Sequence, residues 1–545
     1  MKENQNPNIP RPTPPPSGNV SELLFQKANL YPERTAIVIP TESGDMSYTY
    51  AEIQNDVRTF MKGLTENGIQ KGERILLLFP VCLELYTLIA AIYAVGAVAV
   101  LVDPGMGLKR ILSAIQTANP KAIVSTQKVF QFRWILPTLW RIPLKFSMDG
   151  SGWGIKNISI LQTAGMAELQ NLVPRSSRDH ALITFTSGST GKPKGADRHH
   201  QFLYAQHEAL CRSFPLHENQ IDMTCFPVVV FHNLSCGITT ILPDCDISKP
   251  ALVDPKKIIA QIEKYRVTSL SAAPIFIQKL LLDLEEKKET LISLRQLAMG
   301  GAPIQVNLQE LIYRVLPHTT SFAVYGSTEA EPMAHHHIGP PFVDRDAFVG
   351  GIPVDFIDLK IVSFPKVPPN NENISQFETE IGEIVVAGKH VNEGYIDNPK
   401  ANAENKIKDH QGIIWHRTGD RGFQDDKGCI WLVGRSNDVV HHKDKLFDPF
   451  PIESRLLRDS NIHQAALIEH QRHGMLFLST SYRDDEIPNI LEQVLQKSEL
   501  EFTIAATDSI PVDGRHNSKI DRPALRNWLK YAWWNQGRKY RIIEK

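Results

Sequence analysis

The sequence has no excess of charge of either sign. Its 545 residues include 59 Lys and Arg and 60 Asp and Glu, so the formal net charge at pH 7 is −1. A protein that binds nucleic acid through its overall charge needs a basic surface, and this composition gives no basis for such binding. Hydrophobic residues make up 42% of the chain, which is enough to build a sizeable core.

Cysteines are few, and their spacing is not that of a metal-binding motif. The six cysteines are Cys82, Cys211, Cys225, Cys236, Cys245 and Cys429, and no two of them form a CxxC pair. Most of them lie within apolar stretches. We therefore interpret them as reduced thiols in the core of a cytoplasmic protein, not as metal ligands. The histidine groups at 199–200, 335–337 and 441–442 lack a second set of ligands nearby, and we expect them in solvated loops.

The N-terminus lacks the apolar segment of a secretory signal. The segment NIPRPTPPPSG has prolines there, and we expect residues 1–18 to form a disordered, proline-rich tail. The stretch Leu85–Val102 is uncharged and just reaches the length of a membrane span. Gly96 divides it into a helix-like half and a β-branched half that ends at Asp103. We predict a buried helix followed by a buried strand, and a transmembrane helix is the less favoured alternative.

Strand-like runs alternate with segments of helical length over much of the chain. Examples are GERILLLFP (72–80), KAIVST (121–126), HALITFT (180–186) and VTSLSAAP (267–274). This alternation predicts an α/β fold with layered, largely parallel sheets. The length predicts more than one domain, because single cores stop growing near about 250–300 residues.

The sequence pattern changes after about residue 355. Short strands, glycine turns and the hairpin signal DKG predict a β-rich subdomain at about 355–435, within a large domain of residues 19–435. The polar segment SNDVVHHKDK after Arg435 lacks apolar periodicity, and we expect a linker there. Residues 436–545 then suffice for a small α+β domain.

The segment TFTSGSTGKPKG (184–195) directly follows a predicted buried strand. Its glycines let backbone N–H groups approach an anion, its hydroxyl groups add donors, and its lysines add positive charge. It therefore predicts a phosphate-binding loop, and a flexible surface loop is the alternative. The candidate ligands are Thr186, Ser187, Gly188, Ser189, Thr190, Gly191 and Lys194. Pro193 stands where a Walker A motif requires Ser or Thr, which excludes that motif.

The stretch TSGSTGKPKG resembles the phosphate-loop signature of the acyl-adenylate-forming superfamily, which includes acyl-CoA synthetases, peptide-synthetase adenylation domains and luciferases. Further motifs follow the order of that family: MSYTYAEI (46–53), KGERILLLFP (71–80), GGAP (300–303), YGSTEAEPM (325–333), TGDRG (418–422), GR (434–435) and NSKIDRPAL (517–525). The resemblance implies that a carboxylate reacts with ATP to give acyl-AMP and pyrophosphate. It implies ATP and Mg²⁺ as cofactors, and a mobile C-terminal domain that acts as a catalytic lid.

The resemblance also implies roles for individual residues. Glu329 matches the Mg²⁺ ligand, Thr328 matches a hydroxyl at the α-phosphate, and Lys519 matches the C-terminal catalytic lysine. The expected nucleotide contacts are Gly301, Ala302 and Pro303 at the adenine, Tyr325, Gly326 and Ser327 in the adjoining motif, and Asp420 and Arg435 at the ribose. His232 matches a histidine near the acyl carbonyl. Without the family, Glu329 and Lys519 would be surface residues and His232 the cap of a buried helix.

The segment after Arg435 departs from the pattern of acyl-CoA synthetases. Asn437 replaces an aspartate, Asp444 replaces a glycine and Leu446 replaces an arginine. An aspartate in place of that glycine adds bulk and charge where pantetheine passes. CoA is therefore doubtful as the acyl acceptor.

A narrower resemblance offers another second step. The segments AVLVDPGMG (99–107), FPVVVFHNLSCGITTILPDCD (226–246) and IPVDGRHNSKI (510–520) resemble the β-lactone synthetases of the bacterial long-chain olefin pathway. This implies that the 3-hydroxyl of an adenylated 3-hydroxy fatty acid attacks its own acyl group, releasing a β-lactone and AMP. The alternatives are a fatty-acyl ligase that transfers to CoA or a carrier protein, and a nucleotide-binding scaffold without activity.

The C-terminal segment WLKYAWWNQGRKYRIIEK mixes tryptophans with basic residues. Such a mixture occurs in helices that lie on membrane surfaces. Packing of the tryptophans on the small domain, or against a partner in a multienzyme complex, is the favoured alternative.

Overall fold

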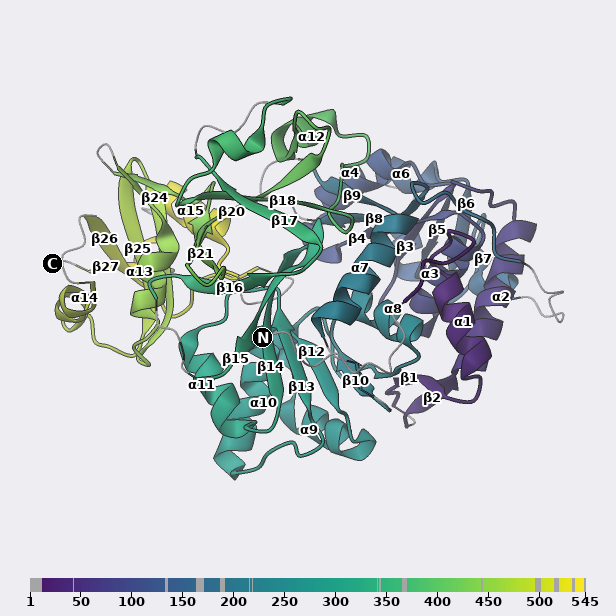
Figure 1. Ribbon diagram of the computed structural model, residues 1–545, viewed down its shortest axis with the longest axis horizontal. Coiled ribbons are helices and arrows are strands. Elements are labelled where there is room, and N and C mark those ends of the chain that lie inside the picture. Colours follow the sequence, from purple (N-terminus) through teal and green to yellow (C-terminus); the bar gives the residue numbers. More distant parts are fainter. Residues whose placement is uncertain are drawn as a thin grey trace.

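The structure is a computed structural model of the chain. It describes residues 12–42, 44–132, 136–162, 171–186, 192–214, 216–217, 219–340, 342, 345–364, 370–442, 445–495, 501–513, 519–531 and 535–543. Its elements follow one another along the molecule, from the N-terminal elements at one end to the C-terminal ones at the other (Figure 1).

The first sheet has the strand order β7-β6-β5-β3-β4-β8-β9. Its strands are β3 (Arg74–Leu78), β4 (Val98–Val102), β5 (Ala122–Ser125), β6 (Leu144–Ser147), β7 (Lys156–Asn157), β8 (His180–Thr186) and β9 (Lys194–His199). All neighbours are parallel except β8 and β9. The helices of this part are α1 (Glu22–Leu30), α2 (Tyr50–Glu66), α3 (Leu83–Ala94), α4 (Leu108–Ala118), α5 (Gln127–Gln131) and α6 (Pro137–Trp140).

Both faces of this sheet are buried. In β3, Ile75 and Leu77 belong to the apolar cluster that includes α2 and α3, whereas Leu76 belongs to the cluster that includes α4. Strands covered on both faces are apolar at every position. This explains why the strand sequences are continuous apolar runs.

The second sheet is longer and mixes parallel with antiparallel strands. Its order is β17-β18-β20-β21-β16-β15-β14-β13-β12-β10-β11-β1-β2, with β19 beside β20. The parallel part contains β1 (Thr35–Ile39), β10 (Ile221–Thr224), β11 (Thr239–Ile241), β12 (Ser269–Ala272), β13 (Gln296–Gly300) and β14 (Thr320–Ser327), and β2 (Met46–Thr49) pairs antiparallel with β1. Its helices are α7 (His200–Ser213), α8 (Pro227–Cys236), α9 (Pro255–Tyr265), α10 (Pro274–Lys287) and α11 (Val306–Val315).

The antiparallel part of this sheet covers the region predicted to be β-rich. It consists of β15 (Ala330–Ile338), β16 (Phe348–Pro353), β17 (Ile357–Val362), β18 (Gly382–Gly388), β19 (Lys406–Lys408), β20 (Ile414–Gln424) and β21 (Ile430–Arg435), with α12 (Pro399–Asn405) before β19. The DKG signal lies in the turn between β20 and β21, as expected. The α/β class with layered sheets is confirmed. The first sheet is largely parallel, as predicted, whereas most strand pairs of the second sheet are antiparallel.

The C-terminal part forms a hairpin and a small sheet. The hairpin is β22 (Val440–His442) with β23 (Lys445–Phe447), and the sheet order is β24 (Ile462–His470), β25 (His473–Thr480), β26 (Phe502–Ala506) and β27 (Arg541–Ile543). The helices are α13 (Pro449–Leu456), α14 (Ile487–Leu495) and α15 (Arg522–Lys530). The domain boundaries at 19, 435 and 545 stay predictions.

The uncharged stretch Leu85–Val102 is a helix followed by a strand, as predicted. It contributes most of α3 and all of β4, and Gly96 between them has a positive φ of 76°. Among the described residues, no helix has the length and apolar character required to cross a membrane.

Two expectations about chain segments are wrong. Residues 12–18 are not disordered: Pro15 is buried, Tyr204 Oη donates to the Pro12 carbonyl at 2.7 Å, and Arg175 N donates to the Ser17 carbonyl at 2.8 Å. Residues 1–11 of the expected tail lie outside the described residues. The segment after Arg435 is not merely a linker, because residues 440–442 and 445–447 pair as β22 and β23.

The histidine groups are not in solvated loops. His335, His336 and His337 lie in β15, and the pair 441–442 lies in β22. His200 begins α7 and is only 1% exposed. Histidine does not strongly favour either strand or loop. Pairing with the neighbouring strands therefore determines the secondary structure at these strand positions.

Candidate active site

Most of the predicted site residues line one cavity of about 2620 Å³. Those that line it are Lys194, His232, Gly301, Ala302, Pro303, Tyr325, Gly326, Ser327, Thr328, Glu329, Asp420, Arg435 and Lys519. Thr186 ends β8, and its side chain is not described. Ser187, Gly188, Ser189, Thr190 and Gly191 lie outside the described residues.

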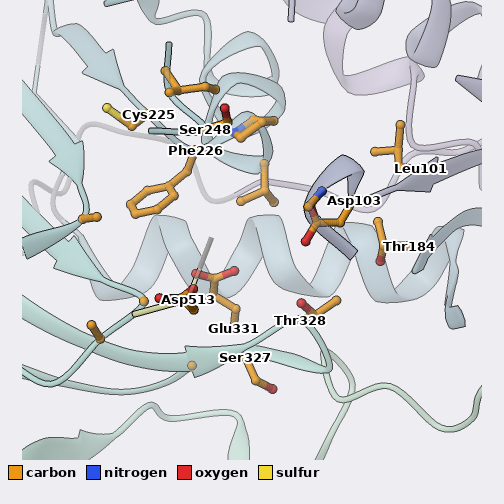
Figure 2. A pocket seen from close by; sticks show the side chains of 18 of the residues that line it. Leu101, Asp103, Thr184, Cys225, Phe226, Ser248, Ser327, Thr328, Glu331 and Asp513 are labelled. Atoms are coloured by element: carbon orange, nitrogen blue, oxygen red, sulfur yellow. The ribbon is translucent and has the colours of Figure 1, made fainter. Parts of the chain in front are cut away.

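Two sheets supply this cavity from the carboxyl ends of their parallel strands. Asp103 follows β4, Gly301 follows β13, and Thr328 follows β14. Carboxyl ends of parallel strands are the usual place for ligands in α/β proteins. Figure 2 shows Leu101, Asp103 and Thr184 at one side of the pocket and Ser327 and Thr328 at another.

Asp420 is held by two donors on neighbouring elements. Tyr325 Oη donates to Asp420 Oδ2 at 2.8 Å, and Arg435 Nε donates to Asp420 Oδ1 at 2.8 Å. Asp420 and Arg435 face each other across β20 and β21. Burial, and secondarily the charge of Asp420, raises the pKa of Tyr325, so this hydroxyl stays protonated and acts as a donor. The carboxylate is thereby fixed in place as an acceptor at the cavity wall.

Glu329 lies in the turn between β14 and β15. Its Oε1 accepts a hydrogen bond from Tyr395 Oη at 2.9 Å. Burial would raise the pKa of Glu329, but the nearby His416 and Lys406 and the Tyr395 hydrogen bond outweigh it and lower the pKa to about 2. An ionised carboxylate is the type of oxygen ligand that Mg²⁺ prefers, so Glu329 fits the expected ion.

Three residues near Glu329 were not predicted as site residues from the sequence. They are Tyr395, Lys406 and His416. Lys406 Nζ lies 5.2 Å from the centre of the Tyr395 ring and donates to the Asn392 carbonyl, and burial lowers the pKa of Lys406 to about 7. His416 lies just before the TGDRG motif and would have been found by extending that motif; nothing in the sequence around Lys406 marks it.

Lys194, the first residue of β9, lies near the Tyr395 ring that contacts Glu329. Its Nζ donates to Asn405 Oδ1 at 3.1 Å and lies 5.6 Å from the centre of the Tyr395 ring. Burial lowers its pKa. The phosphate-loop lysine and the Glu329 carboxylate therefore stand at one end of the cavity.

His232 lies in the other limb of the cavity. It is the sixth residue of α8, so the alternative of a helix-capping histidine is wrong. Its Nδ1 lies 3.1 Å from His207 Nδ1, and its Nε2 lies 3.6 Å from Cys236 Sγ. Burial lowers the pKa of His232 to about 4, which keeps the ring neutral. Its place near an acyl carbonyl stays a prediction.

The surroundings of His232 are largely apolar. The residues lining this limb include Leu203, Cys225, Phe226, Val228, Phe231 and Ile247. Figure 2 shows Cys225 and Phe226 with Ser248 at this side of the pocket. A long hydrocarbon chain would find apolar contacts with these residues.

Lys519 comes to the cavity from the C-terminal part. Its backbone N–H donates to Asp513 Oδ1 at 3.0 Å, and the Asp513 N–H donates to the Lys519 carbonyl at 2.7 Å. Both residues line the cavity. The predicted lysine therefore shares one cavity with Thr328 and Glu329, which lie in the turn between β14 and β15.

Part of the segment that departs from the acyl-CoA synthetase pattern lines the same cavity. Asn437 lines the cavity, and its carbonyl accepts from Arg526 at 3.3 Å. Leu446 is exposed in β23. Asp444 lies outside the described residues.

The sequence and the fold both have known relatives. A profile of the family described as AMP-binding enzyme matches residues 24–396. The olefin beta-lactone synthetase of Stenotrophomonas maltophilia (strain K279a) is 26% identical over 544 residues, with 94% of this chain and 98% of that protein covered. The medium-chain fatty-acid–CoA ligase of Escherichia coli (strain K12) is 25% identical, with 83% and 78% covered.

Among solved structures, ATP-bound MatB from Rhodopseudomonas palustris superposes with a TM-score of 0.79. The match covers 95% of this chain and 99% of that one at 20% identity. At this identity the likeness shows a common fold, in agreement with the α/β class.

Proposed function

The chain belongs to the AMP-binding enzyme family and is an AMP-forming acid ligase, and we propose that it adenylates a 3-hydroxy fatty acid and closes it to a β-lactone. The observation that carries this proposal is one cavity whose lining includes apolar side chains and brings together the polar residues predicted for the site. These polar residues are Asp420 and Arg435, Thr328 and Glu329, and Lys519.

In the first step, a carboxylate oxygen of the acid attacks the α-phosphorus of ATP. A bond forms between that oxygen and phosphorus, the bond from phosphorus to the β-phosphate oxygen breaks, and pyrophosphate leaves. Two anions must meet, so positive charge at the reacting atoms supplies most of the acceleration. We assign this charge to Lys519 and Lys194, and Glu329 would hold Mg²⁺, which would supply further positive charge.

The nucleotide assignments rest on the same geometry. The Asp420 carboxylate suits the ribose hydroxyls because it is an acceptor fixed by Tyr325 and Arg435. Gly301, at a positive φ of 93°, begins the small-residue segment after β13, where a flat base has room. The phosphate contacts proposed for residues 187–191 rest on the sequence motif, because these residues lie outside the described part of the chain.

In the second step, the 3-hydroxyl oxygen attacks the acyl carbon. The bond from that carbon to the AMP oxygen breaks, the hydroxyl loses its proton, and a β-lactone and AMP leave. The tethered hydroxyl gains from proximity, with an effective concentration of about 10⁵ M or more when aligned. Asn437 and Leu446 support this step, because they replace residues typical of CoA transfer, and so does the likeness to the Stenotrophomonas protein.

The E. coli relative favours a second candidate, transfer of the acyl group to CoA. A test compares a 3-hydroxy fatty acid with the same acid lacking the hydroxyl, each with ATP and Mg²⁺, with and without CoA. Mass spectrometry is expected to find lactone and AMP from the hydroxy acid without CoA, and only acyl-AMP from its control. A product that forms only when CoA or a phosphopantetheinyl carrier is present would reject lactone closure.

A further inference from the structure

A cluster of two histidines and two cysteines lies between α7 and α8. His207 and Cys211 stand four residues apart on α7, and His232 and Cys236 stand four residues apart on α8. Residues four apart share one face of a helix. The two faces meet, because the imidazole rings of His207 and His232 have centres 4.9 Å apart.

We propose that His207, Cys211, His232 and Cys236 bind a zinc ion that joins α7 to α8 beside the acyl limb of the cavity. Two thiolates and two imidazoles form a typical zinc site, whereas Mg²⁺ takes oxygen ligands. This ion is therefore distinct from the one expected at Glu329. The site lies outside the reaction proposed above, and nothing in that reaction requires it.

The distances suit a tetrahedral ion. Zinc bonds of about 2.3 Å to sulfur and about 2.0 Å to nitrogen give ligand atoms about 3.3–3.8 Å apart. The two Sγ atoms are 3.8 Å apart, Cys211 Sγ is 3.8 Å from His207 Nε2, and Cys236 Sγ is 3.6 Å from His232 Nε2. One ligand atom from each of the four residues lies within 4.8 Å of all the others.

Both nitrogens of each ring are turned toward the cluster. The two Nδ1 atoms are 3.1 Å apart, while each Nε2 faces a sulfur. Rotation of an imidazole about its Cβ–Cγ bond selects which nitrogen binds the metal.

The position of the cluster indicates what the ion would do. His207 and His232 line the cavity, while neither cysteine does. Four protein ligands leave no open position, which is characteristic of a structural zinc site. The ion would fix α8, whose Phe231 packs edge-on against Tyr86 at 5.5 Å, and so fix the wall of the acyl limb. It would also make His232 a metal ligand instead of a group at the acyl carbonyl.

The sequence contains a pattern for this cluster, but the pattern is not a CxxC motif. The pattern is His-x-x-x-Cys repeated on two helices, in HEALC and HNLSC. A search for CxxC spacing misses it, because each helix contributes one cysteine and the pairing depends on how the helices pack.

The test uses the untagged full chain produced with added zinc, and it measures metal content by mass spectrometry of the elements. The expected result is about one zinc per chain, as for a closed four-ligand site. The Cys211→Ser/Cys236→Ser variant should lose this zinc. The matched control, Cys429→Ser, should retain it, because Cys429 is buried between β20 and β21 away from the cluster.

Cobalt substitution gives a second readout that does not depend on adenylation. Co²⁺ added to the metal-free chain should produce thiolate-to-cobalt absorption in the near ultraviolet, and this band should be absent in the double variant. If the double variant fails to fold by circular dichroism, His207→Gln replaces it, with the same expected loss. Wild-type chain that holds no stoichiometric zinc and gives no cobalt band would overturn the proposal. The two cysteines could instead be found as a Cys211–Cys236 disulfide. If the chain still binds no zinc after this disulfide is reduced, the proposal is also overturned.

Discussion

Glu329 and Lys519 lie far apart in the sequence and line one cavity. Both were found because each stands in a short motif whose residue types are tied to one chemistry, a carboxylate for a hard cation and an ammonium for developing negative charge. Lys406 has no such motif. It matters only because packing places it near Glu329, which the sequence does not reveal.

At Lys519 we expect a large catalytic effect and little effect on stability, because the residue is exposed at the cavity entrance. Lys519→Ala should lower the rate of acid-dependent ATP–pyrophosphate exchange by about 10²–10³-fold. Lys530→Ala, an exposed lysine at the end of α15, is the matched control and should exchange at the wild-type rate. Exchange that survives in Lys519→Ala would remove this lysine from the first step.

Lys406 should give the folding stability a pH dependence. Burial lowers its pKa from 10.5 to about 7 in the folded chain. Above that value the folded chain releases the proton while the unfolded chain keeps it, so the unfolded state binds more protons. The free energy of unfolding therefore rises with pH from about 7 to about 10, by at most about 5 kcal/mol, since the shift spans about 3.5 pKa units of about 1.4 kcal/mol each.

Urea unfolding at several pH values checks this effect. Lys406→Met should lose this part of the rise, while Lys408→Met, at the exposed end of β19, should keep it. Equal slopes in the two variants would contradict the assignment to Lys406.

At the scale of elements, long and strongly patterned segments were predicted well. The helix and strand within Leu85–Val102 were separable because Gly96 interrupts the apolar run. The hairpin of β22 and β23 was missed, because its strands are three residues long and too polar to show alternation. The strand with His335–His337 was missed because its pairing with β14 and β16, not its own composition, fixes it.

The C-terminal tryptophans were predicted either to pack on the small domain or a partner, or to lie on a membrane surface, and α15 carries one of them. Trp528 of α15 stacks on Tyr540, with ring centres 6.4 Å apart and planes 8° apart, and meets Phe477 edge-on at 6.2 Å. This supports packing on the small sheet for Trp528. Trp533 and Trp534 lie outside the described residues.

Trp528→Ala should therefore lower the free energy of unfolding, by about 3 kcal/mol, because it removes a large partly buried ring. Urea unfolding measures this loss, and flotation with anionic liposomes should be the same for variant and wild type. A variant of unchanged stability that no longer floats with liposomes would instead assign the ring to a membrane surface.

At the scale of the whole molecule, the cavity joins parts that no local pattern connects. The first sheet, the second sheet and the C-terminal part each contribute lining residues. The sequence identified many of those residues through motifs. It could not show that the apolar limb ends at a histidine and cysteine cluster, because that depends on how α7 and α8 pack.

The C-terminal part is held to the rest by several ion pairs. Arg421 donates to Asp448 at 2.7 Å and 3.1 Å, and Arg458 donates to Asp346 at 2.9 Å. These contacts accompany the present placement of Lys519 at the cavity. That residues 436–545 move as a lid stays a prediction.

The most direct test of the central claim follows oxygen atoms through the reaction. A 3-hydroxy fatty acid with both carboxylate oxygens replaced by ¹⁸O is converted with ATP, and the products are analysed by mass spectrometry. If the carboxylate attacks the α-phosphorus and the 3-hydroxyl then closes the ring, one ¹⁸O appears in AMP and one remains in the lactone carbonyl. AMP without ¹⁸O, or a lactone that retains both labelled oxygens, would contradict this account.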